Sequence, residues 1–272
     1  MNPILPFLDG VHPADIQKHL HTKWAGRQIE YYSCTDSTNR RAREAGGQGA
    51  SHGTLFIADE QTAGRGRMTR TWQAKHGDSI LMSLLVRPEN TLPQDATGIV
   101  FIAAVAAAAA CRTEGTEVFI KWPNDLIADG KKLCGMLLEM DADIERVNFA
   151  VIGIGLNVKS FPYADDLRHA TCLEKACGHK VRRARVVAAF LDEFEALYEK
   201  WLTEGIEPIL SAYRQYSVTL GRRVRVIGLT ETFEAQALDI LPDGSLLVMT
   251  DDGKGRIVHA GDVSVRGVMD YV

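Results

Sequence analysis

The sequence predicts an α+β fold, in which a mixed or antiparallel sheet is flanked by helices and followed by a small β-barrel. Four strand-like runs follow one another closely between residues 118 and 158, and Asp129-Gly130 between two of them is typical of a tight hairpin. Strands joined by hairpins argue against a doubly wound parallel sheet. After residue 216, five short strand-like runs with turns such as Leu241-Pro242-Asp243-Gly244 predict the barrel.

Local patterns along the chain predict the individual elements. A short helix begins near Pro13, and a strand at 28–33 precedes a helix that is capped at Ser37 and ends before a turn at residues 46–49. Strand 79–86 is apolar almost throughout, which favours a central position in the sheet. The other elements are expected as strands at 54–59, 118–121, 125–128, 132–140, 148–158, 223–227, 232–240, 246–250, 256–259 and 262–266, and as helices at 95–111, 171–176 and 181–201. We therefore expect a lead-in (1–26), a main domain (27–216) and the barrel (217–272).

Composition limits the classes of function. The chain has 272 residues, of which 46% are hydrophobic and 24% charged, as is typical of a soluble globular protein. A net charge of −4 argues against nonspecific nucleic-acid binding but leaves a local anion site open. Five irregularly spaced cysteines indicate neither a disulfide framework nor a zinc site. The apolar run 99–111 is too short to span a bilayer, and no signal sequence opens the chain, so we expect a cytoplasmic protein without a membrane or nucleic-acid partner.

A stretch rich in glycine and arginine, here called the Gly/Arg loop, follows strand 54–59. It reads Gly64-Arg65-Gly66-Arg67-Met68-Thr69-Arg70-Thr71-Trp72. The two glycines allow the backbone to approach a ligand closely, and three arginines in six positions suit a phosphate or a carboxylate. Taken alone, this composition is also typical of a solvated basic loop or of a nucleic-acid contact.

Three further segments place polar groups where elements begin or end: Asp36-Ser37-Thr38-Asn39, Lys121-Trp122-Pro123-Asn124-Asp125-Leu126 and Gly153-Ile154-Gly155-Leu156-Asn157. Helix capping is the favoured explanation of the first, although a helix N-terminus can also hold a polar ligand group. A turn explains the second, and Lys132 would be an exposed hairpin lysine. The third lacks both another glycine and a following helix, so it is not a dinucleotide fingerprint, and the chain contains no P-loop.

These three segments, the Gly/Arg loop with Gln61 before it, and Lys132-Leu133-Cys134-Gly135 occur together in an order that closely resembles biotin protein ligases, also called biotin–[acetyl-CoA-carboxylase] ligases. The resemblance runs from about Gly26 to the C-terminus and includes residues 259–266. It implies a class II synthetase-like biotin/lipoate ligase catalytic domain and an SH3-like barrel. It also implies a cytoplasmic enzyme that uses ATP and Mg²⁺ to activate biotin as biotinyl-5′-AMP. A lysine of a biotin carboxyl carrier protein, such as a subunit of acetyl-CoA carboxylase, would then receive the biotin.

The same resemblance implies roles for individual residues. Lys132 and Arg67 are expected to be catalytic. The expected biotin-binding residues are Ser37, Thr38, Asn39, Gln61, Gly64, Arg65, Gly66, Arg67, Lys132 and Gly135. The expected ATP-binding residues are Arg65, Arg67, Arg70, Trp72, Lys121, Asn124, Asp125 and Asn157. Mg²⁺ would arrive with ATP and has no fixed protein site, with Asp125 nearby if a carboxylate takes part. Thr69 stands where the family commonly has glycine, and a positive φ there would strain the loop.

Alternatives remain for partners and activity. Relatives are often homodimers, and some carry an N-terminal DNA-binding domain and act as repressors. Because only about 26 residues precede the resemblance, we expect a ligase without repressor function. A lipoate–protein ligase shares the fold and the adenylation chemistry, but the segments at 64–67 and 121–126 together favour biotin. A catalytically inactive binding relative is disfavoured by the presence of Arg67 and Lys132.

Overall fold

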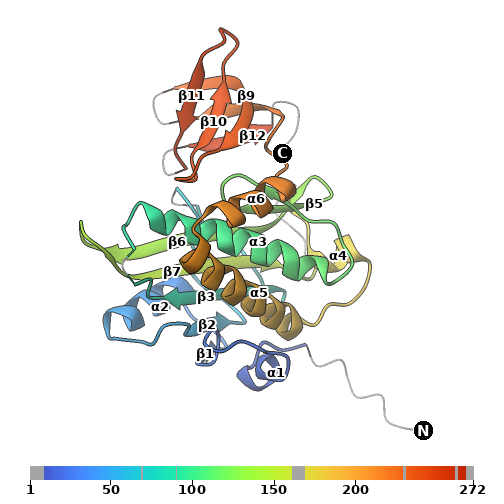
Figure 1. Ribbon diagram of the computed structural model, residues 1–272. Helices are drawn as coiled ribbons and strands as arrows, with labels where there is room; N and C mark the ends of the chain where they lie inside the picture. Colours follow the sequence, from blue (N-terminus) through green and yellow to red (C-terminus); the bar gives the residue numbers. More distant parts are fainter. Residues whose placement is uncertain are drawn as a thin grey trace.

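The computed structural model describes residues 9–68, 70–89, 91–160, 169–228, 231–260 and 263–267. Within these residues a seven-stranded sheet forms the centre of the main domain, and a five-stranded sheet forms a smaller domain at its edge (Figure 1). The strands of the main sheet are β1 (Ile29–Tyr32), β2 (Leu55–Ala58), β3 (Ser79–Val86), β4 (Phe119–Lys121), β5 (Asp125–Ala128), β6 (Lys131–Ala142) and β7 (Val147–Asn157). Their order is β1-β2-β3-β7-β6-β5-β4.

The main sheet is mixed, as the sequence predicted. Among the described strands of this sheet only the pair β1–β2 is parallel, and each of the other neighbouring pairs is antiparallel. The β5–β6 hairpin turns at Asp129 and Gly130, which have φ of 51° and 69°. Positive φ at both central residues is what a two-residue hairpin turn requires, and asparagine, aspartate and glycine adopt it most readily.

Helices cover both faces of this sheet. The helices are α1 (Pro13–Gln17), α2 (Thr38–Gly47), α3 (Gly98–Arg112, preceded by a 3₁₀ turn, Asp95–Thr97), α4 (Leu173–Cys177), α5 (Arg183–Glu204) and α6 (Glu207–Tyr216). Helices α3, α5 and α6 pack together over one face, and α2 packs against β2, β3 and β7.

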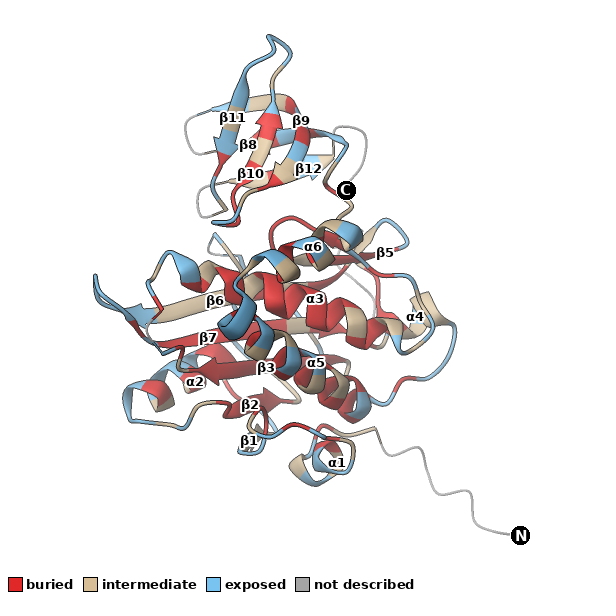
Figure 2. Cartoon of the chain, viewed as in Figure 1, coloured by how far each residue is buried: buried red, intermediate tan, exposed pale blue. Residues whose placement is uncertain are grey.

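Strand β3 contributes to the core on both faces, and it is buried along its whole length (Figure 2). Leu84 and Val86 belong to the large core under α3 and α5, whereas Leu85 packs with Phe56 and Phe149 under α2. Because successive side chains of a strand point to opposite faces, a strand covered on both sides must be apolar throughout. The prediction of an inner strand at 79–86 is therefore confirmed.

Helix α3 is a core helix. Residues 95–112 form a helical segment long and apolar enough to cross a membrane by composition, a longer one than the run expected from the sequence. However, 72% of this segment is buried inside the protein. The small alanine side chains let α5 and the sheet approach α3 closely.

Two expectations about helices were wrong. Helix α2 continues through Gly46 and Gly47, where a turn was expected. A Cβ atom at Gly46 would lie 2.7 Å from the Phe149 ring, so this glycine serves close helix–sheet packing. Helix α6 was not expected at all, although Pro208 in its first turn and the buried Ile209, Leu210 and Tyr213 are typical helix signals.

The smaller domain is an antiparallel sheet. Its strands are β8 (Arg223–Ile227), β9 (Thr232–Ile240), β10 (Leu246–Met249), β11 (Gly255–Val258) and β12 (Ser264–Gly267), in the order β11-β10-β9-β8-β12. Among the described residues β11 and β12 do not pair with each other, and Asp262, at the start of the last expected strand, lies outside them. The domain is joined to the main sheet by the Trp122 indole, which donates to the Gly244 carbonyl at 3.0 Å.

Candidate active site

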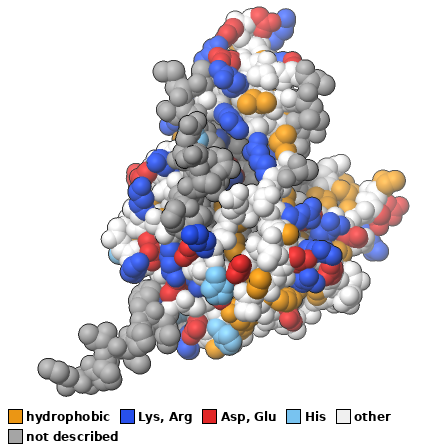
Figure 3. All heavy atoms as spheres, turned by 180° about the vertical axis from the view of Figure 1, so that it is seen from behind, with side chains coloured by type: hydrophobic (Ala, Val, Ile, Leu, Met, Phe, Trp, Pro, Cys, Tyr) orange, Lys and Arg blue, Asp and Glu red, His pale blue; other side chains and the backbone are white. Residues whose placement is uncertain are grey.

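A cavity of about 230 Å³ lies on the α2 face of the main sheet, between the Gly/Arg loop and the smaller domain. Lys and Arg side chains gather around the hollow between the two domains (Figure 3). In the described part of the chain six cationic side chains line the cavity: Arg65, Arg67, Arg70, Lys121, Lys132 and Arg266. Asp125 is the one carboxylate among its described lining residues. The cavity is thus strongly cationic although the whole chain has a net charge of −4.

One end of the cavity is a buried polar cluster at the N-terminus of α2. The Gln61 side-chain oxygen accepts from the Thr38 backbone N–H at 2.7 Å and lies 3.0 Å from the Thr38 hydroxyl. Ser83 on β3 lies within 2.7 Å of the Thr38 hydroxyl and donates to Asn39 Oδ1 at 2.6 Å. The strand β3 therefore supplies a hydroxyl that the sequence analysis did not single out.

Helix capping does not explain this cluster, contrary to the favoured sequence interpretation. Ser37 does occupy the N-cap position, with an extended backbone (φ −160°), but its side chain makes no capping hydrogen bond. Ser37, Thr38 and Asn39 are all buried and all line the cavity. Ser37, the residue at the cap position, therefore presents its side chain to the cavity instead of to the helix backbone.

Three glycines form the floor of the cavity. Gly135 on β6 pairs with Gly155 on β7, and Gly153 lies two residues earlier on the same face of β7. A Cβ atom at Gly155 would lie 2.4 Å from the Trp72 ring, and one at Gly153 would lie 1.9 Å from Asn39 Oδ1. Glycine in these strands therefore allows side chains of the cavity to lie directly on the backbone.

Trp72 closes the Gly/Arg loop over this floor. Its indole N–H is buried and has no hydrogen-bond partner among the described residues. The Lys132 ammonium lies 5.7 Å from the centre of its ring. A buried unpaired donor is costly, so this group is a candidate contact for a bound molecule.

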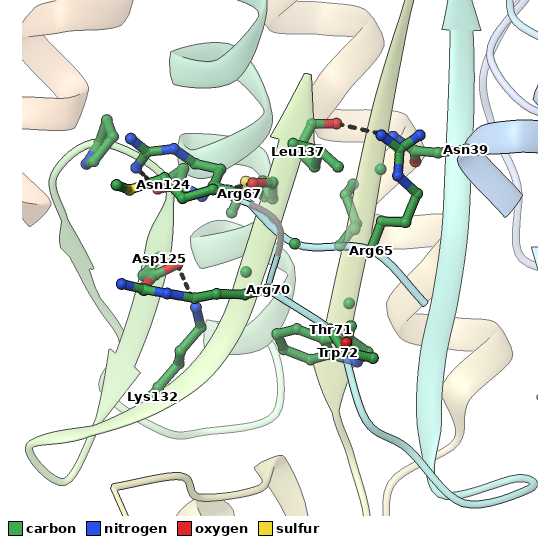
Figure 4. A pocket seen from close by; sticks show the side chains of 18 of the residues that line it. Asn39, Arg65, Arg67, Arg70, Thr71, Trp72, Asn124, Asp125, Lys132 and Leu137 are labelled. Carbon is green, nitrogen blue, oxygen red and sulfur yellow. Dashed lines mark hydrogen bonds and ion pairs between the residues drawn. The ribbon is translucent and has the colours of Figure 1, made fainter. Parts of the chain in front are cut away.

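Lys132 and Asp125 face each other across the β5–β6 hairpin, and Arg70 lies beside them (Figure 4). Lys132 Nζ lies 2.7 Å from Asp125 Oδ1. The backbone of Lys132 is fixed on its other side, because its N–H donates to the His169 carbonyl and its carbonyl accepts from the Thr171 N–H. The expected exposed hairpin lysine is instead only 28% exposed and directed into the cavity.

Lys121 lies deeper in the same cationic region. It ends β4, immediately before Trp122 and Pro123, and is 5% exposed. Burial lowers the pKa of Lys121 to about 8, although the neighbouring Asp125 acts in the opposite direction. The Cys134 thiol in the next motif is fully buried, and burial raises its pKa, which excludes it as a thiolate nucleophile.

Arg67 joins the Gly/Arg loop to both domains. One guanidinium nitrogen donates to Asn124 Oδ1 at 2.8 Å, and the other donates to the carbonyls of Ala260 and Val263, the latter at 3.2 Å. Asn124 is fixed in turn by a 2.6 Å hydrogen bond to the Met136 carbonyl. Burial lowers the pKa of Arg67, which nevertheless remains charged.

The structure brings nearly all of the expected site residues to one cavity. Asn157 lines it near the Thr171 carbonyl, to which its amide donates at 3.1 Å. Gly64 is not among the lining residues; it is buried beneath the Trp72 carbonyl, 2.5 Å from where its Cβ would be. Thr69 lies outside the described residues, so its expected strain remains a prediction. Ser264 and Arg266 of β12 also line the cavity and were not expected there.

Comparisons with known proteins agree with this arrangement. The model of the biotin/lipoate A/B protein ligase family matches residues 31–157, and that of the biotin protein ligase C-terminal domain matches residues 219–266. The fold is similar to that of a biotin protein ligase from Aquifex aeolicus in complex with biotin and ATP, with a TM-score of 0.78 and 23% identity over 89% of this chain and 99% of that one.

Two curated relatives are similar over most of their length. The bifunctional ligase/repressor BirA of Bacillus subtilis is 38% identical over 251 residues, which are 91% of this chain and 77% of the relative. A biotin–[acetyl-CoA-carboxylase] ligase of Mycobacterium tuberculosis is 35% identical over 245 residues, 87% of this chain and 88% of the relative. The chain belongs to the biotin protein ligase family.

Proposed function

We propose that this protein activates biotin with ATP and transfers it to a lysine of a biotin carboxyl carrier protein. In the first step a biotin carboxylate oxygen attacks the α-phosphorus of ATP, and the bond to the β-phosphate breaks to release pyrophosphate. In the second step the lysine amine attacks the carbonyl carbon of biotinyl-5′-AMP. An amide bond forms, AMP leaves, and the amine loses a proton to solvent.

The observation that carries this proposal is the cavity lined by six cations and a single described carboxylate. The first step brings two anions together and spreads charge over phosphate oxygens, so fixed cations lower its barrier by positioning and charge stabilisation. In this proposal Lys132 contacts the reacting carboxylate and the α-phosphate, and Arg70, Lys121 and Arg266, which line the same cavity, contact the remaining phosphates.

The polar end of the cavity favours biotin over lipoate. Biotin carries a ureido ring with N–H donors and a carbonyl acceptor, whereas the dithiolane ring of lipoate has neither. The side chains of Thr38, Asn39 and Gln61 line the cavity and can pair with a ureido ring, and Ser83 holds Thr38 and Asn39 from behind. A dithiolane would leave such groups unpaired, and a site built to hydrogen-bond its ligand rejects an analogue that lacks the partner atoms.

Mg²⁺ is expected with the nucleotide. Within the described residues no cluster of three His, Cys, Asp or Glu side chains could hold a metal. A magnesium ion bound to nucleotide phosphates needs only one or two protein carboxylates, and Asp125 fits this requirement. The ion would neutralise part of the phosphate charge.

The mixed anhydride must be protected from water between the two steps. The Gly/Arg loop spans the cavity and is itself folded, since Gly66 N–H donates to the Arg70 carbonyl at 2.7 Å and Trp72 N–H donates to the Gly64 carbonyl at 3.0 Å. A loop of this kind can open for the carrier lysine and close over the intermediate.

The first test is exchange of labelled pyrophosphate into ATP, with biotin, lipoate or no acid. We expect exchange with biotin alone. Exchange with lipoate alone would make the protein a lipoate ligase, and no exchange from folded protein with Mg²⁺ would refute the adenylation step. Transfer is then followed by mass spectrometry of a carrier domain, with a Lys→Arg carrier as the control.

We also propose that the N-terminal segment has no repressor role in this protein. In residues 9–28 the described structure contains one helix, α1, of five residues, which packs against α5. A recognition helix must instead be free to enter a DNA groove. Gel-shift titration of biotin-loaded protein with a pool of random duplexes tests this; retention of a defined sequence would contradict it.

A further inference from the structure

Glu139 on β6 receives hydrogen bonds from two separate segments that border the cavity. Its Oε2 accepts from Asn39 Nδ2 at 2.9 Å, and its Oε1 lies 3.0 Å from Arg65 Nη1 and 3.2 Å from Arg43 Nη1. The side chain is only 13% exposed, although Arg65 and Arg43 are about half exposed. Glu139 itself does not line the cavity.

The first consequence is that the Asn39 amide has a fixed direction. An ionised carboxylate can only accept, so the nitrogen of Asn39 must face Glu139, and the Leu137 carbonyl accepts from the same nitrogen at 3.3 Å (Figure 4). Asn39 Oδ1 then accepts from Ser83 and lies against the backbone of Gly153. The cavity is thereby offered an amide oxygen rather than an amide nitrogen.

The second consequence concerns the Gly/Arg loop. Arg65 pairs with Thr71 in an isolated antiparallel bridge, so the described residues on either side of Thr69 form a small hairpin of their own. The Arg65–Glu139 ion pair joins one side of this hairpin to β6, on the opposite side from the contacts that Arg67 makes with Asn124 and the smaller domain. Of these two polar contacts, the Arg65–Glu139 ion pair is the one that lies near Asn39.

We propose that Glu139 is a positioning residue that serves both half-reactions, an inference that rests on the proposed function. It orients Asn39 toward the ring of the acid, and through Arg65 it holds the Gly/Arg loop closed so that the acyl-adenylate is retained until the carrier lysine arrives.

Arg43 provides a matched control for this ion pair. It contacts the same carboxylate oxygen as Arg65, but it belongs to α2 and not to the Gly/Arg loop. Replacing Arg43 removes one of the two positive charges beside Glu139 and leaves the Arg65–Glu139 contact in place. Glu139→Gln keeps an acceptor for Asn39 and removes the charge that attracts Arg65, whereas Glu139→Ala removes both.

The test compares Glu139→Gln, Glu139→Ala, Arg65→Gln, the Glu139→Gln/Arg65→Gln double variant and Arg43→Gln. Release of preformed labelled acyl-adenylate is followed after a chase, together with the KM for biotin in pyrophosphate exchange. We expect release to be about fivefold faster in either loop-contact variant, the scale of a partly exposed ion pair. The double variant should release no faster than either single variant, because both remove one interaction. Arg43→Gln should remain within about twofold of the parent protein, and Glu139→Ala alone should also raise the KM for biotin.

Hydrogen–deuterium exchange of the ligand-free protein tests the Arg65–Glu139 contact independently of enzymatic activity. The amides of Gly66 and Trp72 are hydrogen-bonded within the hairpin. They should exchange faster in Glu139→Gln than in the parent protein, and at the parent rate in Arg43→Gln. Unchanged exchange and release in Glu139→Gln, or equal effects of Arg43→Gln and Arg65→Gln, would overturn the inference. Absence of pyrophosphate exchange in the parent protein would instead overturn the proposed function, and the deuterium result would still decide whether Glu139 holds the loop.

Discussion

Lys132 Nζ lies 2.7 Å from Asp125 Oδ1, and the two residues stand on adjacent strands of one hairpin. Asp125 pairs with Gly135 and Lys132 pairs with Ile127, because the register shifts at an irregularity between Leu126 and Ile127. Lys132 thus reaches along the hairpin toward Asp125. Its ammonium group is held over the cavity floor, where a bound carboxylate and phosphate would compete for it.

Lys132→Ala is expected to slow biotin-dependent pyrophosphate exchange by about 10²–10³-fold, the cost of removing one preorganised group that stabilises transition-state charge. Its melting temperature should change little, because the side chain is partly exposed and paired with a single aspartate. Lys131→Ala is the matched control, since Lys131 begins the same strand and does not line the cavity. Equal exchange rates in both variants would contradict the role assigned to Lys132.

Gly155→Ala is expected to weaken ATP binding without unfolding the protein. The added methyl group would lie 2.4 Å from the Trp72 ring, so the ring must move away from the floor of the cavity. If Trp72 packs against the adenine, the loss should be about 1–3 kcal/mol, or roughly 5- to 150-fold in the KM for ATP. The kinetics of pyrophosphate exchange at varied ATP measure this.

Gly47→Ala is the control for this prediction. No atom lies within 4 Å of the added methyl group, and the residue lies at the end of helix α2. Alanine favours helix over glycine, so this variant should keep the KM for ATP and melt at the same or a higher temperature. An equal rise in the KM for ATP in both variants would show that the effect does not depend on the position of Gly155 at the cavity floor.

The pH dependence of ATP use should report Lys121. Burial lowers its pKa to about 8, so its positive charge is lost as the pH rises through that value. We expect kcat/KM for ATP to fall by about tenfold per pH unit above 8, because this parameter follows the free enzyme. Lys121→Arg stays charged and should abolish the fall. A fall of the same size in both proteins would assign it to another group.

Two histidines should affect acid stability in opposite directions. His52 Nδ1 accepts from the Arg87 N–H at 2.9 Å, and burial lowers the pKa of His52 from its usual 6.5. The unfolded chain then binds the proton more readily, so stability is lost as the pH falls below 6.5 toward the lower folded pKa. His52→Gln should reduce the drop in melting temperature between pH 7 and pH 5.

His179 should behave in the opposite way. Its two ring nitrogens face the carbonyls of Lys180 and Glu114, and these backbone hydrogen bonds raise the pKa of His179 above 6.5. The stabilisation is complete below 6.5 and is lost as the pH rises through the higher folded pKa. His179→Gln should therefore enlarge the drop on acidification, and differential scanning calorimetry at both pH values distinguishes the two variants. If both variants changed the acid-induced drop in melting temperature in the same direction, the assignment to His52 and His179 would be contradicted.

Local signals allowed much of the fold to be predicted. The Asp129-Gly130 turn and the apolar strand at 79–86 each have a physical cause within a few residues, and both were confirmed. Gly46 was misread because the need for glycine there comes from Phe149, about a hundred residues away. A glycine that opens a turn and one that permits close packing look the same in a sequence.

The candidate site shows the same division. Ser37 has the residue type and position of a cap, and only the structure shows that its side chain makes no capping bond. Glu139 could not be singled out, because its contacts come from α2 and the Gly/Arg loop, which are adjacent only after folding. Arg266 had a weak signal, since it ends the segment 259–266 that contributed to the resemblance.

The smaller domain reaches Arg67 through main-chain oxygens of Ala260 and Val263. Every residue type offers the same oxygen, so the amino acids at these two positions are free to vary while the contact persists. Substitutions of the side chains at positions 260 and 263 would therefore leave this contact unchanged. Sequence covariation between these positions and Arg67 would likewise not reveal it. A backbone ester in place of the amide that follows Ala260 would weaken its carbonyl as an acceptor and make this interdomain contact measurable.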